Sequence, residues 1–206
     1  MKFVLSIDGG GIRGLIPAIA LAELEKRLNK PVAAMFDLIC GTSTGGILAL
    51  GLVKDNGAGE PQYTANELAK IYQDKGRDIF QRSFWQGMSS VGSLMDEKYS
   101  AKGLESVLKD YFENEPLGAA LKNVMVTTYD IQNREPIFLK SWHPKHKSLE
   151  MRLAGRATSA APTYFEPALT PVAGSIKALI DGGVFINNPA VSAYVEALRL
   201  FPGEEV

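Results

Sequence analysis

The most constraining feature of the sequence is a serine placed between two glycines where an apolar strand runs into a helix. Residues 35–40 form a short apolar run that predicts a buried strand, and residues 44–53, rich in Leu and Ala, predict a helix. In such a sharp turn the central residue, Ser43, takes a strained backbone conformation and projects its hydroxyl above the sheet. Gly41 and Gly45 allow neighbouring backbone to approach closely. Ser43 is therefore the candidate nucleophile, and a plain Ser/Thr-rich helix N-cap is the alternative.

Apolar runs of strand and helix type alternate along the rest of the chain. Strands are predicted over 3–7, 124–129, 136–142 and 176–180, and helices over 15–28, 65–80, 101–112, 149–158 and 189–200. This alternation is typical of a sheet covered by helices on both faces. We therefore expect an α/β protein, a three-layer α/β/α sandwich around a mostly parallel central sheet, formed as a single domain by residues 1–206.

The composition excludes several classes of protein. A formal net charge of −1 gives no basic surface for a nucleic acid polymer. The single cysteine allows no intrachain disulfide, which favours a reducing compartment. The first residues lack the pattern of a signal peptide, and the apolar runs are shorter than the roughly 20 residues of a membrane-spanning helix. We expect a cytoplasmic protein that can still work at a membrane surface.

A glycine loop at residues 8–14, Asp-Gly-Gly-Gly-Ile-Arg-Gly, lies between the first predicted strand and helix. Its glycines fit the dinucleotide-binding pattern, but the second strand does not end in the acidic residue that this pattern requires, and no Gly-Lys-Ser/Thr follows. Consecutive glycines can instead point several N–H groups at one oxyanion. The predicted donors are the amides of Gly9, Gly10, Gly11 and Thr44. Arg13 is expected to contact a phosphate or to brace the loop, and nucleotide binding remains the alternative.

The candidate general base is an aspartate. The chain has two histidines, His143 and His146, both in a polar loop broken by proline, and none follows Asp181. The Ser–Asp–His order of the α/β-hydrolases is therefore impossible. Asp181 directly follows an apolar strand, where ligands of α/β sheets collect, although an Asp-Gly turn would look the same. Burial would have to raise the basicity of this carboxylate before it could take a serine proton. The hypothesis is a Ser43–Asp181 dyad.

Together these motifs resemble the patatin-like phospholipases, in the form of a bacterial-type patatin domain. The glycine loop resembles the oxyanion loop of that family, residues 41–45 its nucleophile elbow and residues 181–183 its aspartate motif. Residues 156–165 and 187–189 resemble two further family blocks. The resemblance implies the patatin-like sandwich and hydrolysis of fatty acyl esters by a Ser–Asp dyad, without metal or other cofactor. Family members usually continue into another strand, which leaves open whether a C-terminal portion is missing here.

The resemblance implies a phospholipase A or lysophospholipase whose partner is a phospholipid or another acyl lipid, met during transient contact with a membrane surface. Two alternatives stay open: a bacterial defence effector switched on by a second messenger or a partner, and a weakly active binding or storage protein. The oligomeric state is not predicted. Within residues 61–120, aromatic and other apolar side chains indicate either buried core or a lid or membrane-docking surface: Phe84, Trp85, Met88, Val91, Leu94 and Met95.

Overall fold

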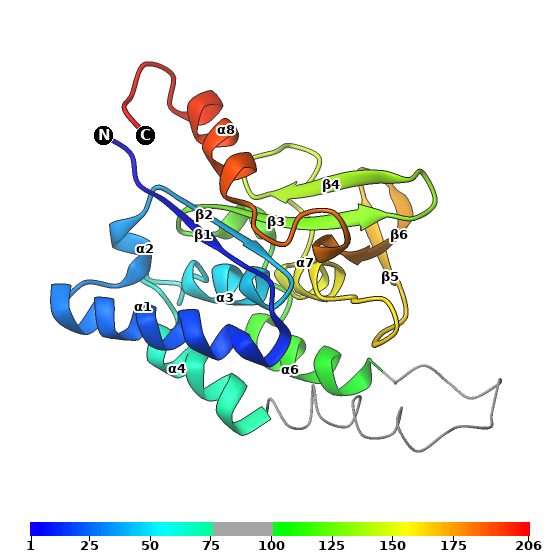
Figure 1. The fold of residues 1–206 in the computed structure, drawn as a ribbon, viewed down its shortest axis with the longest axis horizontal. Helices are drawn as coiled ribbons and strands as arrows, with labels where there is room; N and C mark the ends of the chain where they lie inside the picture. Colours follow the sequence, from blue (N-terminus) through cyan, green and yellow to red (C-terminus); the bar gives the residue numbers. More distant parts are fainter. Residues whose placement is uncertain (76–100) are drawn as a thin grey trace.

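The computed structural model describes residues 1–75 and 101–206. The six aromatic and apolar residues between 84 and 95, and with them the question of core or membrane-docking surface, lie outside the described residues. In the described part a sheet lies between two helical layers, with one helix on one face and the other helices on the opposite face (Figure 1). The predicted three-layer α/β/α architecture is confirmed.

The sheet contains six described strands in the order β1-β2-β3-β6-β5, with β4 paired to β3 off this path. β1 pairs parallel with β2, and β2 parallel with β3, whereas the β3–β4, β3–β6 and β6–β5 pairs are antiparallel. Four strands, β1, β2, β3 and β5, thus run in one direction, as a mostly parallel sheet requires. The strands are β1 (Val4–Ile7), β2 (Leu38–Thr42), β3 (Asn123–Asp130), β4 (Glu135–Lys140), β5 (Ala168–Val172) and β6 (Ser175–Asp181).

Strands β2 and β6 meet end to end along one edge of β3. Because β4 pairs with β3 from Met125 to Asp130, it occupies the other edge of β3 over those residues. β2 pairs with the first half of β3 and ends with Thr42 opposite Thr127, while β6 runs the opposite way and ends with Asp181 opposite Thr128. The carboxyl ends of two strands that are far apart in the chain therefore point at each other.

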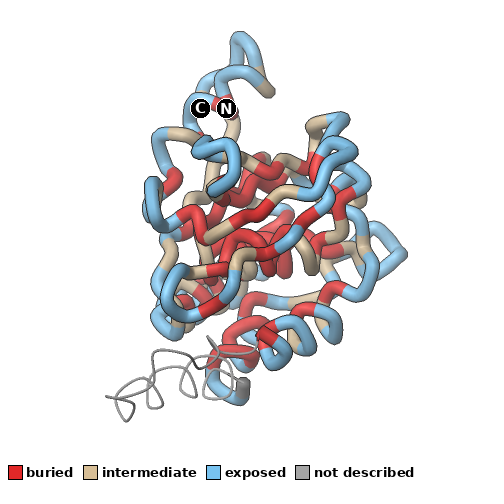
Figure 2. The backbone as a smooth tube through the Cα atoms, turned by 90° about the vertical axis from the view of Figure 1, so that its right-hand side faces the viewer, coloured by how far each residue is buried: buried red, intermediate tan, exposed pale blue. Residues whose placement is uncertain are grey.

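The side chains of β2 point alternately to the two faces of the sheet, so they contribute to a hydrophobic cluster on each face. Leu38 and Cys40 pack with Ala193 and Ala197 of α8, whereas Ile39 joins the larger cluster beneath the other helices. Figure 2 shows the buried segments running through the centre of the molecule, with exposed turns around them.

The helices are α1 (Leu15–Leu28), α2 (Val32–Met35), α3 (Thr44–Leu52), α4 (Ala65–Lys70), α6 (Lys102–Phe112), α7 (Met151–Thr158) and α8 (Ala190–Leu200), and the short helical turns are η1 (Gly11–Gly14), η2 (Ile71–Lys75), η4 (Leu117–Ala119) and η5 (Gly182–Val184).

Three elements differ from the prediction. Met35 belongs to α2 rather than to a strand, and β2 starts only at Leu38. The α-helix that starts at Ala65 ends at Lys70 and gives way to one turn of π-helix, and its predicted end near residue 80 lies outside the described residues. Strand β5 was not predicted, because it is short and contains a proline. It forms a hairpin with β6, and tertiary pairing rather than local pattern makes it a strand.

Candidate active site

Ser43 lies at the junction of β2 and α3 with backbone angles φ 56° and ψ −127°. A non-glycine residue at positive φ is uncommon and costs free energy, which the surroundings must offset. The backbone N–H of Ser43 donates to Thr158 Oγ1 at 3.0 Å, and this hydroxyl donates to the carbonyl oxygen of Thr127 at 2.7 Å. The turn at Ser43 is therefore strained, and Thr158, at the end of α7, helps to hold it.

The two glycines of the elbow are required by the close approach of backbone to backbone. A Cβ atom at Gly41 would lie 2.2 Å from the carbonyl oxygen of Gly45. A Cβ atom at Gly45 would lie 2.5 Å from the carbonyl oxygens of Ile7 and Asp8 at the end of β1. Neither obstacle is the end of a flexible side chain, so no small shift relieves it. The elbow is thus packed directly against the strand that leads into the glycine loop.

Asp181 faces the serine. Ser43 Oγ donates to Asp181 Oδ2 at 2.5 Å, and Asp181 Oδ1 accepts from the N–H of Gly183 at 2.7 Å. The Asp181 backbone N–H donates to the carbonyl oxygen of Ala160, just beyond α7. The residue is only 5% exposed. Burial raises the pKa of its carboxyl above the ordinary value, and the hydrogen bonds from Ser43 and Gly183 only partly oppose that shift. The carboxylate is therefore a stronger base than an exposed aspartate.

The glycine loop lies against Ser43. A Cβ atom at Gly9 would be 3.1 Å from Ser43 Cβ. The Gly9 N–H donates to the Asn187 carbonyl oxygen at 3.1 Å, and Asn187 Nδ2 donates back to the Gly9 carbonyl oxygen at 3.2 Å. Since this clamp uses the Gly9 amide, the predicted role of Gly9 as an oxyanion donor is replaced by a role in holding the loop. The amides of Gly10, Gly11 and Thr44 have no acceptor among the described residues, so they remain the candidate donors.

Tyr72, which the sequence did not single out, links the glycine loop to the elbow. Its hydroxyl donates to the carbonyl oxygen of Thr44 at 2.8 Å. Its ring touches Gly14, where a Cβ atom would lie 2.7 Å from the ring carbon Cε1. The side chain is 5% exposed and belongs to η2, a turn of π-helix of the kind that is frequent at functional sites. Local pattern could not reveal this contact, because Tyr72 lies 28 residues from Thr44.

The two histidines and Arg13 form no hydrogen bond with Ser43 or Asp181. His143 and His146 stack on each other with ring centroids 4.5 Å apart, and His146 Nδ1 accepts from the Lys140 N–H. Burial lowers the pKa of His146 to about 4. Arg13 is exposed and forms no ion pair or side-chain hydrogen bond with the described residues, so a bracing role for its side chain finds no support there. Across residues 1–75 and 101–206, no three metal-ligating side chains gather.

The fold and the site define a class: an α/β sandwich whose nucleophile elbow faces a buried aspartate. A family model described as patatin-like phospholipase matches residues 5–194, and the chain belongs to this family. Patatin-like protein 2 of Oryza sativa subsp. indica is 39% identical over 210 residues, which cover 94% of this chain and 52% of that protein. A cGAMP-activated phospholipase of Pseudomonas aeruginosa is 37% identical over 194 residues, 91% of this chain and 54% of that protein. VipD from Legionella pneumophila is 16% identical, with a TM-score of 0.45 over 91% of this chain and 46% of that chain.

The predicted family is thereby confirmed. The chain spans about half the length of the curated relatives that it matches. In the described part, no helix has both the length and the apolar character needed to cross a membrane.

Proposed function

We propose that the chain hydrolyses fatty acyl esters of phospholipids or related lipids, with Ser43 as nucleophile and Asp181 as general base. The observation that carries this proposal is the 2.5 Å hydrogen bond from Ser43 Oγ to a buried carboxylate at the carboxyl end of a second strand. A nucleophile within hydrogen-bond reach of a base of raised pKa is the arrangement that nucleophilic catalysis needs. Family membership supports the lipid ester as substrate class.

Acylation starts when Asp181 Oδ2 accepts the proton of the Ser43 hydroxyl as Oγ attacks the ester carbonyl carbon. The carbonyl oxygen becomes an oxyanion, and the amides of Gly10, Gly11 and Thr44 donate to it. One such donor typically contributes about 3 kcal/mol to the transition state. The bond to the leaving alcohol then breaks, and Asp181 returns the proton to the alcohol oxygen. An acyl-serine remains.

Deacylation repeats these steps with water. Asp181 takes a proton from a water molecule, whose oxygen attacks the acyl carbon of the Ser43 ester. The same three amides hold the second oxyanion. Collapse of this intermediate releases the fatty acid, and the proton on Asp181 returns to Ser43 Oγ. Because Gly183 donates to Oδ1, the other carboxylate oxygen stays directed at the reacting atoms throughout.

The membrane-surface contact, the cytoplasmic location and a phosphate contact of Arg13 belong to this proposal. The relative from P. aeruginosa is named as activated by cGAMP, whereas the residues that carry our proposal are those of the elbow and the aspartate. A weakly active storage protein of the same fold is distinguished by turnover rather than by geometry.

The test is labelling with a fluorophosphonate followed by peptide mass spectrometry. We expect one adduct per chain, on Ser43, and loss of both the adduct and fatty acid release in Ser43→Ala. The neighbouring residue Thr42 provides a matched control. Its hydroxyl is hydrogen-bonded to Thr127 Oγ1, and Thr42→Val should retain labelling at Ser43. Labelling at another residue, or fatty acid release by Ser43→Ala, would sink the proposal. Stoichiometric labelling without steady turnover would point to the storage protein.

A further inference from the structure

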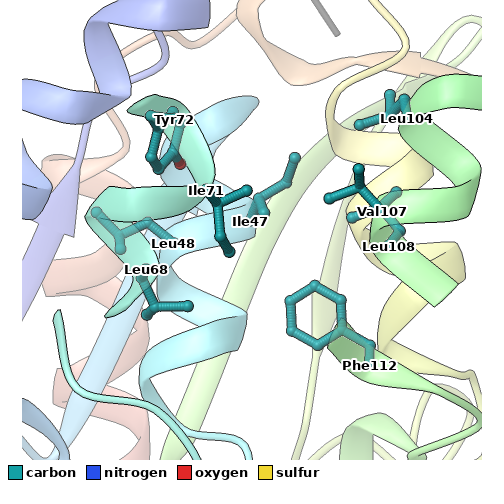
Figure 3. Close-up of a pocket in the computed structure, with 9 residues that line it drawn as sticks. All are labelled: Ile47, Leu48, Leu68, Ile71, Tyr72, Leu104, Val107, Leu108 and Phe112. Atoms are coloured by element: carbon teal, nitrogen blue, oxygen red, sulfur yellow. The ribbon is translucent and has the colours of Figure 1, made fainter. Parts of the chain in front are cut away.

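An apolar cavity separates α3 and α4–η2 on one side from α6 on the other. Figure 3 shows Ile47 pointing across the gap toward Val107, with Ile71 beside Ile47 and Phe112 lower in the view. The cavity has a volume of about 20 Å³. We call this region the α3–α6 seam; its lining residues are Ile47, Leu48, Leu68, Ile71, Tyr72, Leu104, Val107, Leu108 and Phe112.

One end of the seam lies next to the nucleophile. The Ile47 N–H donates to the carbonyl oxygen of Ser43, so Ile47 is one helical turn, about 5 Å, beyond the elbow. At the same end the Tyr72 hydroxyl donates to the carbonyl oxygen of Thr44. Further along α3, Leu68 lies against Gly51, where a Cβ atom would be 2.6 Å from Leu68 Cδ2. The α4–η2 wall therefore runs from the elbow toward the far end of α3.

Helix α6 forms the opposite wall in the same direction. Near its start, Glu105 pairs with Arg156 Nε at 3.1 Å, two residues before the Thr158 that holds the elbow. One turn later, Leu108 lies against Gly155. From Leu104 to Phe112 the helix rises about 12 Å, so the wall leads from the dyad deep into the molecule.

We propose that the α3–α6 seam binds the acyl chain of the substrate, with Ile47 and Val107 at its mouth and Phe112 at its floor. This inference rests on the proposed function, because the acyl carbon bonds to Ser43 Oγ. The lining is apolar, and its one hydroxyl, that of Tyr72, already donates to Thr44. Such a lining suits methylene groups and leaves no polar group unpaired.

The seam binds the acyl chain by widening. Its volume of about 20 Å³ has room for about one water-sized group. Ile47 and Val107 are half-buried, whereas Leu108 and Phe112 are buried. Ile47 and Val107 are thus the more exposed part of the lining, where an acyl chain enters and moves the side chains of α6 outward. Each methylene group that leaves water for this lining is expected to raise kcat/KM about fourfold.

The first test measures kcat/KM on p-nitrophenyl esters of butyrate, octanoate and palmitate. We expect a rise from butyrate to octanoate that flattens once the chain reaches Phe112. Val107→Phe narrows the seam and should lower the octanoate-to-butyrate ratio about tenfold or more. Val191→Phe makes the same change at an exposed position of α8 and should leave the ratio at its original value. Equal ratios in the two variants would overturn the proposal.

The second test does not depend on a variant that folds. An alkyl fluorophosphonate with a diazirine near the chain end places the chain in the unaltered protein, and mass spectrometry locates the crosslink. We expect crosslinks to Leu68, Leu108 or Phe112. A second hollow of about 460 Å³ lies beside the glycine loop and contains Ile16 and Pro17, and crosslinks there would place the acyl chain along α1 and overturn the proposal. Failure to label Ser43 overturns the proposed function itself, whereas labelled Ser43 with crosslinks outside the seam overturns only the seam.

Discussion

Ser43 and Asp181 are 138 residues apart in the chain, yet Ser43 Oγ donates to Asp181 Oδ2 at 2.5 Å. The register of β3 explains this contact. Thr42 ends β2 opposite Thr127, and Asp181 ends β6 opposite Thr128, the next residue of the same strand. The two side chains are therefore positioned by backbone pairing rather than by flexible loops, which keeps the geometry of the dyad rigid.

Asp181→Asn should abolish hydrolysis and stabilise the protein at neutral pH. Loss of the base is expected to lower kcat about a thousandfold. Because burial raises the pKa of this carboxyl in the folded state, the folded protein binds the proton more tightly than the unfolded chain, and the ionised form costs stability above that pKa. The neutral amide avoids this cost. Thermal unfolding should show a higher Tm than wild type at pH 7 and a difference that shrinks as the pH falls toward 4; a lower Tm at pH 7 would contradict the assignment.

The acid limb of kcat/KM should lie above the ordinary aspartate pKa of about 4. Asp181 must be ionised to accept the serine proton, so activity falls as the pH drops through its raised pKa. His146, whose pKa is lowered to about 4, titrates near this range and needs a control. The double variant His143→Ala/His146→Ala should keep both the activity and the midpoint of the limb. If the midpoint of the acid limb shifts in this double variant, the titrating group is a histidine rather than Asp181.

Tyr72→Phe should lower kcat while leaving KM close to that of wild type. The variant keeps the ring against Gly14 but loses the hydrogen bond to Thr44, whose amide is a candidate oxyanion donor. A net loss of about 1 kcal/mol in the transition state lowers the rate about fivefold.

Tyr63→Phe is the matched control for this experiment. Its hydroxyl also donates to a backbone carbonyl oxygen, that of Tyr111, at 3.0 Å, but away from the elbow. Both variants should lose similar thermal stability, a few degrees in Tm, and only Tyr72→Phe should lose kcat. Equal kcat values for Tyr72→Phe and Tyr63→Phe would show that Tyr72 contributes only to packing.

Gly41→Ala should destabilise the fold by about 3 kcal/mol, because the new Cβ would lie 2.2 Å from the Gly45 carbonyl oxygen. Gly103→Ala is the control: this glycine is in α6, and no atom lies within 4 Å of the site of its Cβ. The control should be neutral or up to about 1 kcal/mol more stable. Urea unfolding measures the free energy of unfolding of both variants, provided that the slope of this free energy against urea concentration stays unchanged. Equal stabilities of Gly41→Ala and Gly103→Ala would refute the close packing of the elbow.

The local sequence pattern was sufficient to predict the helices and strands with strong apolar periodicity and to locate the motifs. The strand-to-helix turn at Ser43, the glycine loop and the strand that ends at Asp181 were all predicted, because glycine spacing and apolar runs report local backbone geometry directly. Strand β5 and the π-turn at Tyr72 were not, since each depends on partners distant in the chain.

The sequence by itself determined which side chains are candidates for the chemistry: a serine between glycines, an aspartate after an apolar strand, and histidines in a loop that does not fit the order of a triad. Only the tertiary structure decided how these groups meet. The pairing of β2 and β6 along one edge of β3 brings Ser43 and Asp181 together, the hydrogen bonds with Asn187 remove the Gly9 amide from the candidate oxyanion donors, and burial raises the pKa of Asp181. The physical reason is that hydrogen-bond partners and solvent exclusion depend on contacts between distant segments, whereas strand, turn and helix signals are local.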